Sequence, residues 1–168
     1  MKLWITLPLL FLGMYGTAHA DEHEVRCLAE NIYFEARSES TAGKVAVALV
    51  VLNRVKDNRF PNTICGVVKQ TKYYPSGRID LHSCQFSWYC DGKPDIPTED
   101  CWEDILLLAN VLLKWKSKED ITKGALWYHS KKVNPDWASH YVKTLTVETI
   151  SSINLLTNTS IEPIIDLC

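Results

Sequence analysis

Two consecutive segments with helical periodicity constrain the fold of this chain most strongly. The apolar residues of the first recur at spacings of three and four, and they are Val25, Leu28, Ala29, Ile32 and Ala36. This spacing predicts an amphipathic helix over residues 24–38. Ser38-Glu39-Ser40 ends that helix, and a second, strongly apolar helix is predicted over residues 41–56 with Thr41 as its N-cap. A helical domain is therefore expected.

One acidic residue interrupts the apolar face of the first helix. Glu35 lies three positions after Ile32, so its carboxyl group falls on the face that is directed to the core. Burial disfavours the charged form of a carboxyl group and raises its pKa, which is the property that a general acid needs near neutral pH. A buried structural ion pair with Arg37 or Arg54 is the alternative interpretation, and the pattern alone leaves both open.

The remaining elements predict a single α+β domain that is mainly helical. A short helix is predicted over residues 63–70, and a long helix over residues 98–116. Between them, residues 71–97 are rich in Tyr, Pro, Gly and Ser and predict a long ordered loop of the kind that carries function. Residues 125–129 and 144–150 are rich enough in aromatic and β-branched residues to predict two short strands.

The first twenty residues have the pattern of a secretory signal peptide. Lys2 precedes an apolar run, and Ala18-His19-Ala20 provides a small-x-small cleavage site. We therefore expect residues 1–20 to be a signal peptide and residues 21–168 to be a single catalytic domain, exported as a monomer to the periplasm or the extracellular space. No later segment reaches the ~20 apolar residues of a membrane span, and a formal net charge of −2 argues against nucleic acid as a partner.

Six cysteines follow the predicted signal peptide, at positions 27, 65, 84, 90, 101 and 168. An even number in an exported chain predicts disulfides, although many pairings are possible. Cys84 and Cys90 would close a tight loop, and Cys168 could fix the C-terminal tail. A zinc site that includes His82, Cys84 and Cys90 is the alternative, but the spacing does not match a zinc motif and the chain has no C-x-x-C. We therefore expect neither a metal nor another cofactor.

Four sequence blocks then occur in the order and spacing of a known family. The first block comprises residues 32–40, 43–48 and 51–55, and the others are residues 60–68, residues 84–92, and residues 124–129 with 133–138. Together they resemble the spore-cortex-lytic (SleB-like) cell-wall hydrolase family over residues 27–140. Two departures stand out: Ser38 occupies a position where the family has glycine, and the tail after residue 140 lacks the family's Gly-x-His-x-Phe ending.

The resemblance implies a compact lysozyme-like α+β fold that acts on the glycan strands of peptidoglycan. It also implies that Glu35, the glutamate of the Glu-Ala-Arg motif, is the catalytic acid. The expected reaction is cleavage between N-acetylmuramic acid and N-acetylglucosamine.

Two chemistries are open for this cleavage. Hydrolysis in the usual scheme needs a second carboxylate, whereas a lytic transglycosylase uses one glutamate as acid and then as base and leaves a 1,6-anhydro end. Glu39, Asp80, Asp91 and Asp136 are less well placed than Glu35, so the sequence favours transglycosylation and leaves muramidase-type hydrolysis as the alternative.

The supporting residues are predicted with less specific signals. Gln85 and Ser87 could hydrogen-bond an N-acetyl group or a sugar hydroxyl, and Tyr128 and His129 could hold a sugar ring. Each of these residues has a purely structural role as its alternative. Two rival functions also remain: an N-acetylmuramoyl-L-alanine amidase, which normally requires a metal triad that this chain lacks, and a noncatalytic peptidoglycan-binding or inhibitor module.

Overall fold

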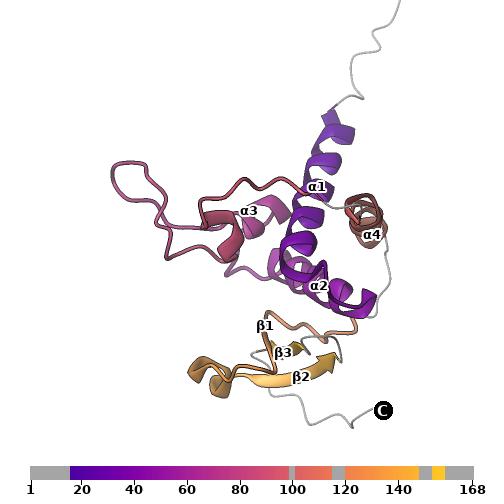
Figure 1. Cartoon of the computed structure of the whole chain (residues 1–168), viewed down its shortest axis with the longest axis vertical. Coiled ribbons are helices and arrows are strands. Elements are labelled where there is room, and N and C mark those ends of the chain that lie inside the picture. Colours follow the sequence, from indigo (N-terminus) through magenta and orange to yellow (C-terminus); the bar gives the residue numbers. More distant parts are fainter. Residues whose placement is uncertain (1–15, 99–100, 115–119, 148–152, 158–168) are drawn as a thin grey trace, which may run out of the picture.

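The computed structural model describes residues 16–98, 101–114, 120–147 and 153–157. Four α-helices lie toward one end of the molecule, and a small sheet lies at the other end below α2 (Figure 1). The α-helices are α1 (Gly16–Ala36), α2 (Thr41–Lys56), α3 (Ile64–Val68) and α4 (Trp102–Lys114). The strands are β1 (Trp127–Ser130), β2 (Val142–Val147) and β3 (Ile153–Thr157). Of the two 3₁₀ helices, η1 (Ser87–Cys90) lies between α3 and α4, and η2 (Asp136–His140) lies between β1 and β2.

The helix boundaries agree with the sequence prediction at most ends. The structure begins α1 at Gly16, inside the predicted signal peptide, rather than near residue 24. The N-cap of α2 is Ser40, whose side chain accepts a hydrogen bond from the Gly43 N–H at 3.3 Å, so the prediction of Thr41 was wrong by one residue. The fourth helix begins at Trp102 instead of residue 98, and the Thr98 N–H donates a hydrogen bond to the Tyr33 hydroxyl at 3.2 Å.

Helix α2 is buried on two faces, which explains its strongly apolar sequence. Ala48 and Val51 pack into a cluster with the apolar faces of α1, α3 and α4, whose fully buried members include Leu28, Ile32 and Val67. On the other side of α2, a second cluster joins the helix to the sheet, and its members are Ala36, Ala46, Val47, Val50, Ala125, Val147 and Leu155. The helix therefore connects the helical part of the core to the sheet.

The sheet is antiparallel, with the strand order β1-β3-β2. Its pairing brings Tyr128 opposite Leu155 and Trp127 opposite Leu156, with an irregularity in β2 between Lys143 and Leu145. The two strands predicted from the sequence are present with shifted boundaries, whereas the central strand β3 was not predicted. Although the tail lacks the ending expected of the family, residues 153–157 complete the sheet.

The loop over residues 71–97 is fixed to the helices as predicted. A disulfide joins Cys84 to Cys90, and the buried indole of Trp88 donates a hydrogen bond to Asn31 on α1 at 3.3 Å. The indole also stacks on Phe34, with ring centroids 4.6 Å apart. The sulfurs of Cys84 and Cys90 are joined to each other, so these residues do not provide the thiolates of the alternative zinc site.

A second disulfide, Cys27–Cys65, joins α1 to α3. The expected role of Cys168 lies outside the described residues. Within the part of the chain that the structure describes, none of the helices combines the length and the apolarity that crossing a membrane requires.

Candidate active site

Glu35 lies in the last turn of α1, between the two buried clusters. Its helix neighbours Ile32 and Ala36 are buried, and Glu35 itself is half-buried. The Tyr128 hydroxyl of β1 donates a hydrogen bond to Glu35 Oε2 at 2.8 Å. The last turn of α1 and the strand β1 therefore hold the acid in one orientation.

The surroundings of Glu35 favour its protonated form. Burial raises the pKa of Glu35 above its ordinary value, although the hydrogen bond from Tyr128 and the positive charge of Arg54 act in the opposite direction. In the structure, the Glu35 carboxyl group accepts a hydrogen bond from Tyr128, and Arg54 contributes a nearby positive charge. The sequence prediction of an acid with a raised pKa is confirmed in direction.

Tyr128 remains a neutral donor in this contact. Burial raises its pKa well above the ordinary value, and the nearby charge of Glu35 and the hydrogen bond to it act in the same direction. The hydroxyl therefore stays protonated and stabilises the carboxylate form of Glu35 through a charge-assisted hydrogen bond. The sequence predicted Tyr128 to be a sugar contact, and the structure places its hydroxyl on the acid itself.

Arg54 on α2 provides the positive charge near this pair. Its Nε donates a hydrogen bond to the Leu126 carbonyl at 2.8 Å, and its guanidinium group lies against the rings of Phe60 and Phe86, at 5.3 and 5.4 Å from their centroids. Burial lowers the pKa of Arg54, whereas the groups of Tyr128 and Glu35 raise it. Among the described residues, its buried Nη1 has no hydrogen-bond partner.

A polar network that the sequence did not predict holds the segment before β1. Asn53 Nδ2 donates hydrogen bonds to Asp120 Oδ2 at 2.8 Å, to Thr122 Oγ1 at 3.1 Å and to the Ala125 carbonyl at 3.2 Å. Asp120 also accepts hydrogen bonds from the Thr122 N–H and hydroxyl and from the Gly124 N–H. The network fixes the entry to β1 and therefore the position of Tyr128. The signal in the sequence was an asparagine that directly follows the apolar run of α2.

His129 is directed away from Glu35. Successive side chains of a strand point to opposite faces, so Tyr128 faces the helices and His129 faces outward. His129 Nδ1 lies 2.9 Å from the Ser130 carbonyl and 3.1 Å from the Val133 carbonyl, so it must carry the proton and act as the donor. Its ring contacts Trp137 edge to face, with centroids 5.8 Å apart. The structure therefore does not bring His129 to the acid beside Tyr128.

Gln85 and Ser87 are exposed and flank the buried Phe86. The ring of Phe86 lies against the guanidinium group of Arg54, which connects this part of the loop to the surroundings of Glu35. Their predicted role in sugar binding stays a prediction.

Two of the carboxylates considered as a second catalytic group are held within their own loops. Asp80 accepts hydrogen bonds from the His82 N–H and the Tyr74 hydroxyl. Asp91 accepts one from the Lys93 N–H and forms an ion pair with Lys93 Nζ at 3.5 Å. These contacts do not position either carboxylate for a reaction beside Glu35.

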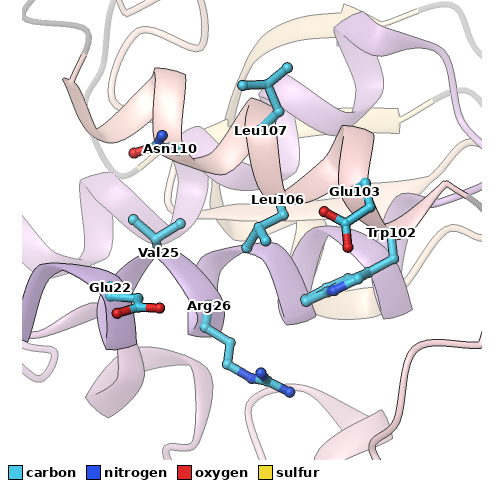
Figure 2. Close-up of a pocket in the computed structure, with 8 residues that line it drawn as sticks. All are labelled: Glu22, Val25, Arg26, Trp102, Glu103, Leu106, Leu107 and Asn110. Carbon is cyan, nitrogen blue, oxygen red and sulfur yellow. The ribbon is translucent and has the colours of Figure 1, made fainter. Parts of the chain in front are cut away.

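A hollow of about 480 Å³ lies elsewhere, between α1 and α4 (Figure 2). It is lined by Val25, Trp102 and Leu106, and its rim carries charged groups such as Glu22. Glu22 and Glu35 lie about 20 Å apart along α1, because an α-helix rises 1.5 Å per residue. Glu35 does not line this hollow, so the hollow is not the candidate active site.

Comparison with known proteins assigns the family. Residues 38–151 match the family described as Cell Wall Hydrolase. The chain belongs to that family. Glu35 lies three residues before the matched region.

Two bacterial spore cortex-lytic enzymes are similar to the chain in sequence. It is 46% identical over 118 residues to the spore cortex-lytic enzyme of Bacillus subtilis (strain 168), a match that covers 70% of this chain and 31% of that protein. It is 40% identical over 119 residues to the spore cortex-lytic enzyme of Bacillus cereus, covering 70% of this chain and 37% of that protein. The matches span about a third of the length of these relatives.

Solved structures of two catalytic domains share the fold. The catalytic domain of the germination-specific lytic transglycosylase SleB from Bacillus anthracis superposes with a TM-score of 0.58 at 24% identity, covering 86% of this chain and all of that domain. The catalytic domain of the Bacillus cereus SleB protein gives a TM-score of 0.54 at 25% identity, covering 84% of this chain and 93% of that domain. The predicted fold, a mainly helical domain with a small β element, is confirmed.

Proposed function

We propose that this chain cleaves the glycan strand of peptidoglycan between N-acetylmuramic acid and N-acetylglucosamine, as a lytic transglycosylase with Glu35 as its acid and base. The observation that carries the proposal is the half-buried carboxyl group of Glu35, whose pKa is raised by burial and whose oxygen accepts a hydrogen bond from Tyr128. Membership of the Cell Wall Hydrolase family supports the substrate class. The name of the structurally similar Bacillus anthracis domain supports the reaction type.

In the first step, the protonated carboxyl group of Glu35 donates its proton to the glycosidic oxygen. The bond between this oxygen and C1 of the muramic acid breaks, and positive charge develops on the sugar ring. Glu35 becomes a carboxylate at the same time. The Tyr128 hydroxyl and the positive charge of Arg54 both stabilise this carboxylate, because both favour the charged form of Glu35.

In the second step, the carboxylate of Glu35 accepts the proton of the sugar's own C6 hydroxyl group. The C6 oxygen attacks C1 and closes a 1,6-anhydro ring, and Glu35 regains the proton that it gave in the first step. No water is consumed, and no second carboxylate is required. A mechanism with a single carboxyl group is consistent with a structure in which Asp80 and Asp91 form contacts within their own loop.

Two further features complete the proposal. The exposed side chains of Gln85 and Ser87 would hydrogen-bond the N-acetyl or hydroxyl groups of the bound sugars, from a loop fixed by the Cys84–Cys90 disulfide. The predicted signal peptide over residues 1–20 would export the chain to the periplasm or the extracellular space, where peptidoglycan lies.

Analysis of reaction products tests the proposal. The purified chain is incubated with peptidoglycan, and the soluble fragments are weighed by mass spectrometry. Anhydro-ended fragments, lighter than hydrolysis products by one water molecule, are the expected result. Glu35→Gln should reduce their release by about 10²–10⁴-fold, the usual contribution of a general acid. Glu39→Gln is the matched control, since it removes the other carboxylate near the end of α1 and should retain activity.

Other products identify the alternatives. Fragments that carry one additional water molecule would indicate muramidase-type hydrolysis. Release of stem peptides, with free lactyl carboxyl groups left on the glycan strand, would indicate an amidase. Binding to peptidoglycan without soluble products would indicate a noncatalytic module. Full activity of the Glu35→Gln variant would contradict the assignment of the acid.

A further inference from the structure

The outer face of the sheet carries a groove on the side of β1 opposite to Glu35. Trp127 pairs with Leu156, and Leu156 pairs in turn with Lys143, so these side chains share the face that is turned away from the helices. The 3₁₀ helix η2 lies beside this face. We call the space between them the η2 groove, and its lining includes His129, Asp136, Ser139, Tyr141, Lys143 and Leu156.

Tyr141 and His129, which line the groove, belong to a series of contacting aromatic rings. Trp127 contacts Tyr141 with ring centroids 4.3 Å apart, Tyr141 contacts Trp137 at 6.1 Å, and Trp137 contacts His129 at 5.8 Å. Trp137 remains 41% exposed, although it is the largest side chain of η2. The exposed part of the Trp137 indole is therefore accessible to a ligand that packs on aromatic rings.

The chemistry of the groove fits a sugar ring. Its volume of about 520 Å³ lies within the range of small-molecule sites. A pyranose ring presents apolar C–H groups on its face, which pack on flat aromatic side chains, and hydroxyl groups around its edge, which need hydrogen-bond partners. The groove lining offers the ring of Tyr141 together with the polar groups of Asn134, Ser139 and Lys143. The ring of Trp137 contacts that of Tyr141 and lies next to this lining.

Side-chain contacts across β1 connect the rings beside the groove to the surroundings of Glu35. Trp127 directly precedes Tyr128, whose hydroxyl group donates a hydrogen bond to Glu35. The ring of Phe60 lies 6.4 Å from that of Trp127, centroid to centroid, and the guanidinium group of Arg54 lies 5.3 Å from the centroid of Phe60. Because β1 is an edge strand of the sheet, a polymer bound at Glu35 can pass over this edge without crossing other strands. A long glycan strand is thus the occupant that would reach both places.

We propose that the η2 groove is a saccharide-binding site that holds N-acetylated sugar units of the glycan strand at a distance from the cleaved bond, with Trp137 and Tyr141 as its stacking surface. This inference rests on the proposed function, because it assigns a second part of the same polymer to the chain. It predicts that the chain prefers long glycan strands to short ones.

Binding is measured apart from catalysis to test this inference. The Glu35→Gln variant, which should bind without cleaving, is titrated with soluble β-1,4-linked N-acetylglucosamine oligosaccharides of increasing length by isothermal titration calorimetry. Trp137→Ala in this background should weaken binding of the long oligosaccharides by about tenfold, which is the effect of losing one aromatic contact of about 1.4 kcal/mol. Binding of the shortest oligosaccharides should change little, and Trp137→Phe should restore most of the affinity.

Leu107→Ala is the matched control, because Leu107 is another exposed apolar side chain but lies on α4. A second measurement needs no change in the groove: NMR signals of the indole N–H groups are followed during the titration, and those of Trp127 and Trp137 should shift. Unchanged affinity of Trp137→Ala for long oligosaccharides, or unchanged signals of these two indoles, would overturn the inference. Cleavage by the Glu35→Gln variant would instead contradict the proposed acid, and the groove would still be judged by its binding.

Discussion

Replacing Tyr128 by Phe isolates the hydrogen bond that controls the acid. The substitution removes the hydroxyl group that donates to Glu35 Oε2 at 2.8 Å and leaves the ring in place. This hydrogen bond favours the carboxylate, so its loss raises the pKa of Glu35 further above the ordinary value. The general acid must be protonated when substrate binds, so the alkaline limb of the pH profile of kcat/KM should move to higher pH.

The contact geometry sets the size of this effect. A hydrogen bond to a charged group contributes about 1.5–3 kcal/mol, and the lower end applies here because Glu35 is only half-buried. About 1.4 kcal/mol corresponds to a tenfold change in an equilibrium constant, so the acid dissociation constant of Glu35 should fall about tenfold. The rate on the acidic side of the profile should fall as well, because the variant stabilises the newly formed carboxylate less.

The measurement is the initial rate of release of soluble fragments from peptidoglycan across a pH series at low substrate concentration. Tyr33→Phe is the matched control, since its hydroxyl group accepts a hydrogen bond from the Thr98 N–H and does not contact Glu35. The control should retain the pH profile of the unmodified chain. An alkaline limb that stays in place, or moves to lower pH, in the Tyr128→Phe variant would refute the proposed electrostatic role of this hydrogen bond.

Two further predictions concern stability. Replacing both cysteines of the Cys27–Cys65 disulfide by alanine should lower the free energy of unfolding by about 4 kcal/mol, and the same change at Cys84–Cys90 should lower it by about 2 kcal/mol. The first effect is larger because that disulfide closes the longer loop. Urea denaturation measures both, and a reverse ranking of the two variants would contradict this reasoning. Burial raises the pKa of Asp120, but its several hydrogen bonds outweigh this effect, so the pKa is lower in the folded state than in the unfolded state. Asp120 therefore stabilises the fold at pH values above its unfolded pKa, and this stabilisation is lost as the pH falls through the folded pKa. Asp120→Asn should flatten the acid side of the curve of Tm against pH, and an unchanged curve would exclude this contribution.

The helices could be predicted from the sequence because each has a local signal. Two apolar runs separated by Ser38-Glu39-Ser40 gave α1 and α2 nearly to the residue at their C-terminal ends. The strand β3 could not be predicted in the same way, because the five residues of Ile153–Thr157 carry no alternation that distinguishes a strand from a helical fragment. Its place between β1 and β2 depends on pairing with distant segments.

In the candidate site, too, the features with a local sequence signal could be predicted, and the contacts between distant residues could not. The unusual position of Glu35 was readable from helical spacing, whereas its contact with Tyr128 joins residues that are 93 positions apart. Strand alternation could have separated Tyr128 from His129, because adjacent residues of a strand cannot both face the acid. The hydrogen bonds of Asn53 to residues near β1 had only one sign in the sequence, a polar side chain directly after an apolar run.

The backbone of α1 itself acts on the acid that it carries. Glu35 lies in the last turn of the helix, where the aligned peptide dipoles leave partial negative charge on the carbonyl groups, and that turn contains no basic residue. A negative charge at this end is disfavoured by about 0.3–1 kcal/mol, so the helix favours the protonated acid independently of the surrounding side chains. Substitutions of Tyr128 or Arg54 therefore change the proton affinity of Glu35 without removing this part of it. The bias toward a proton donor is set by where the helix ends.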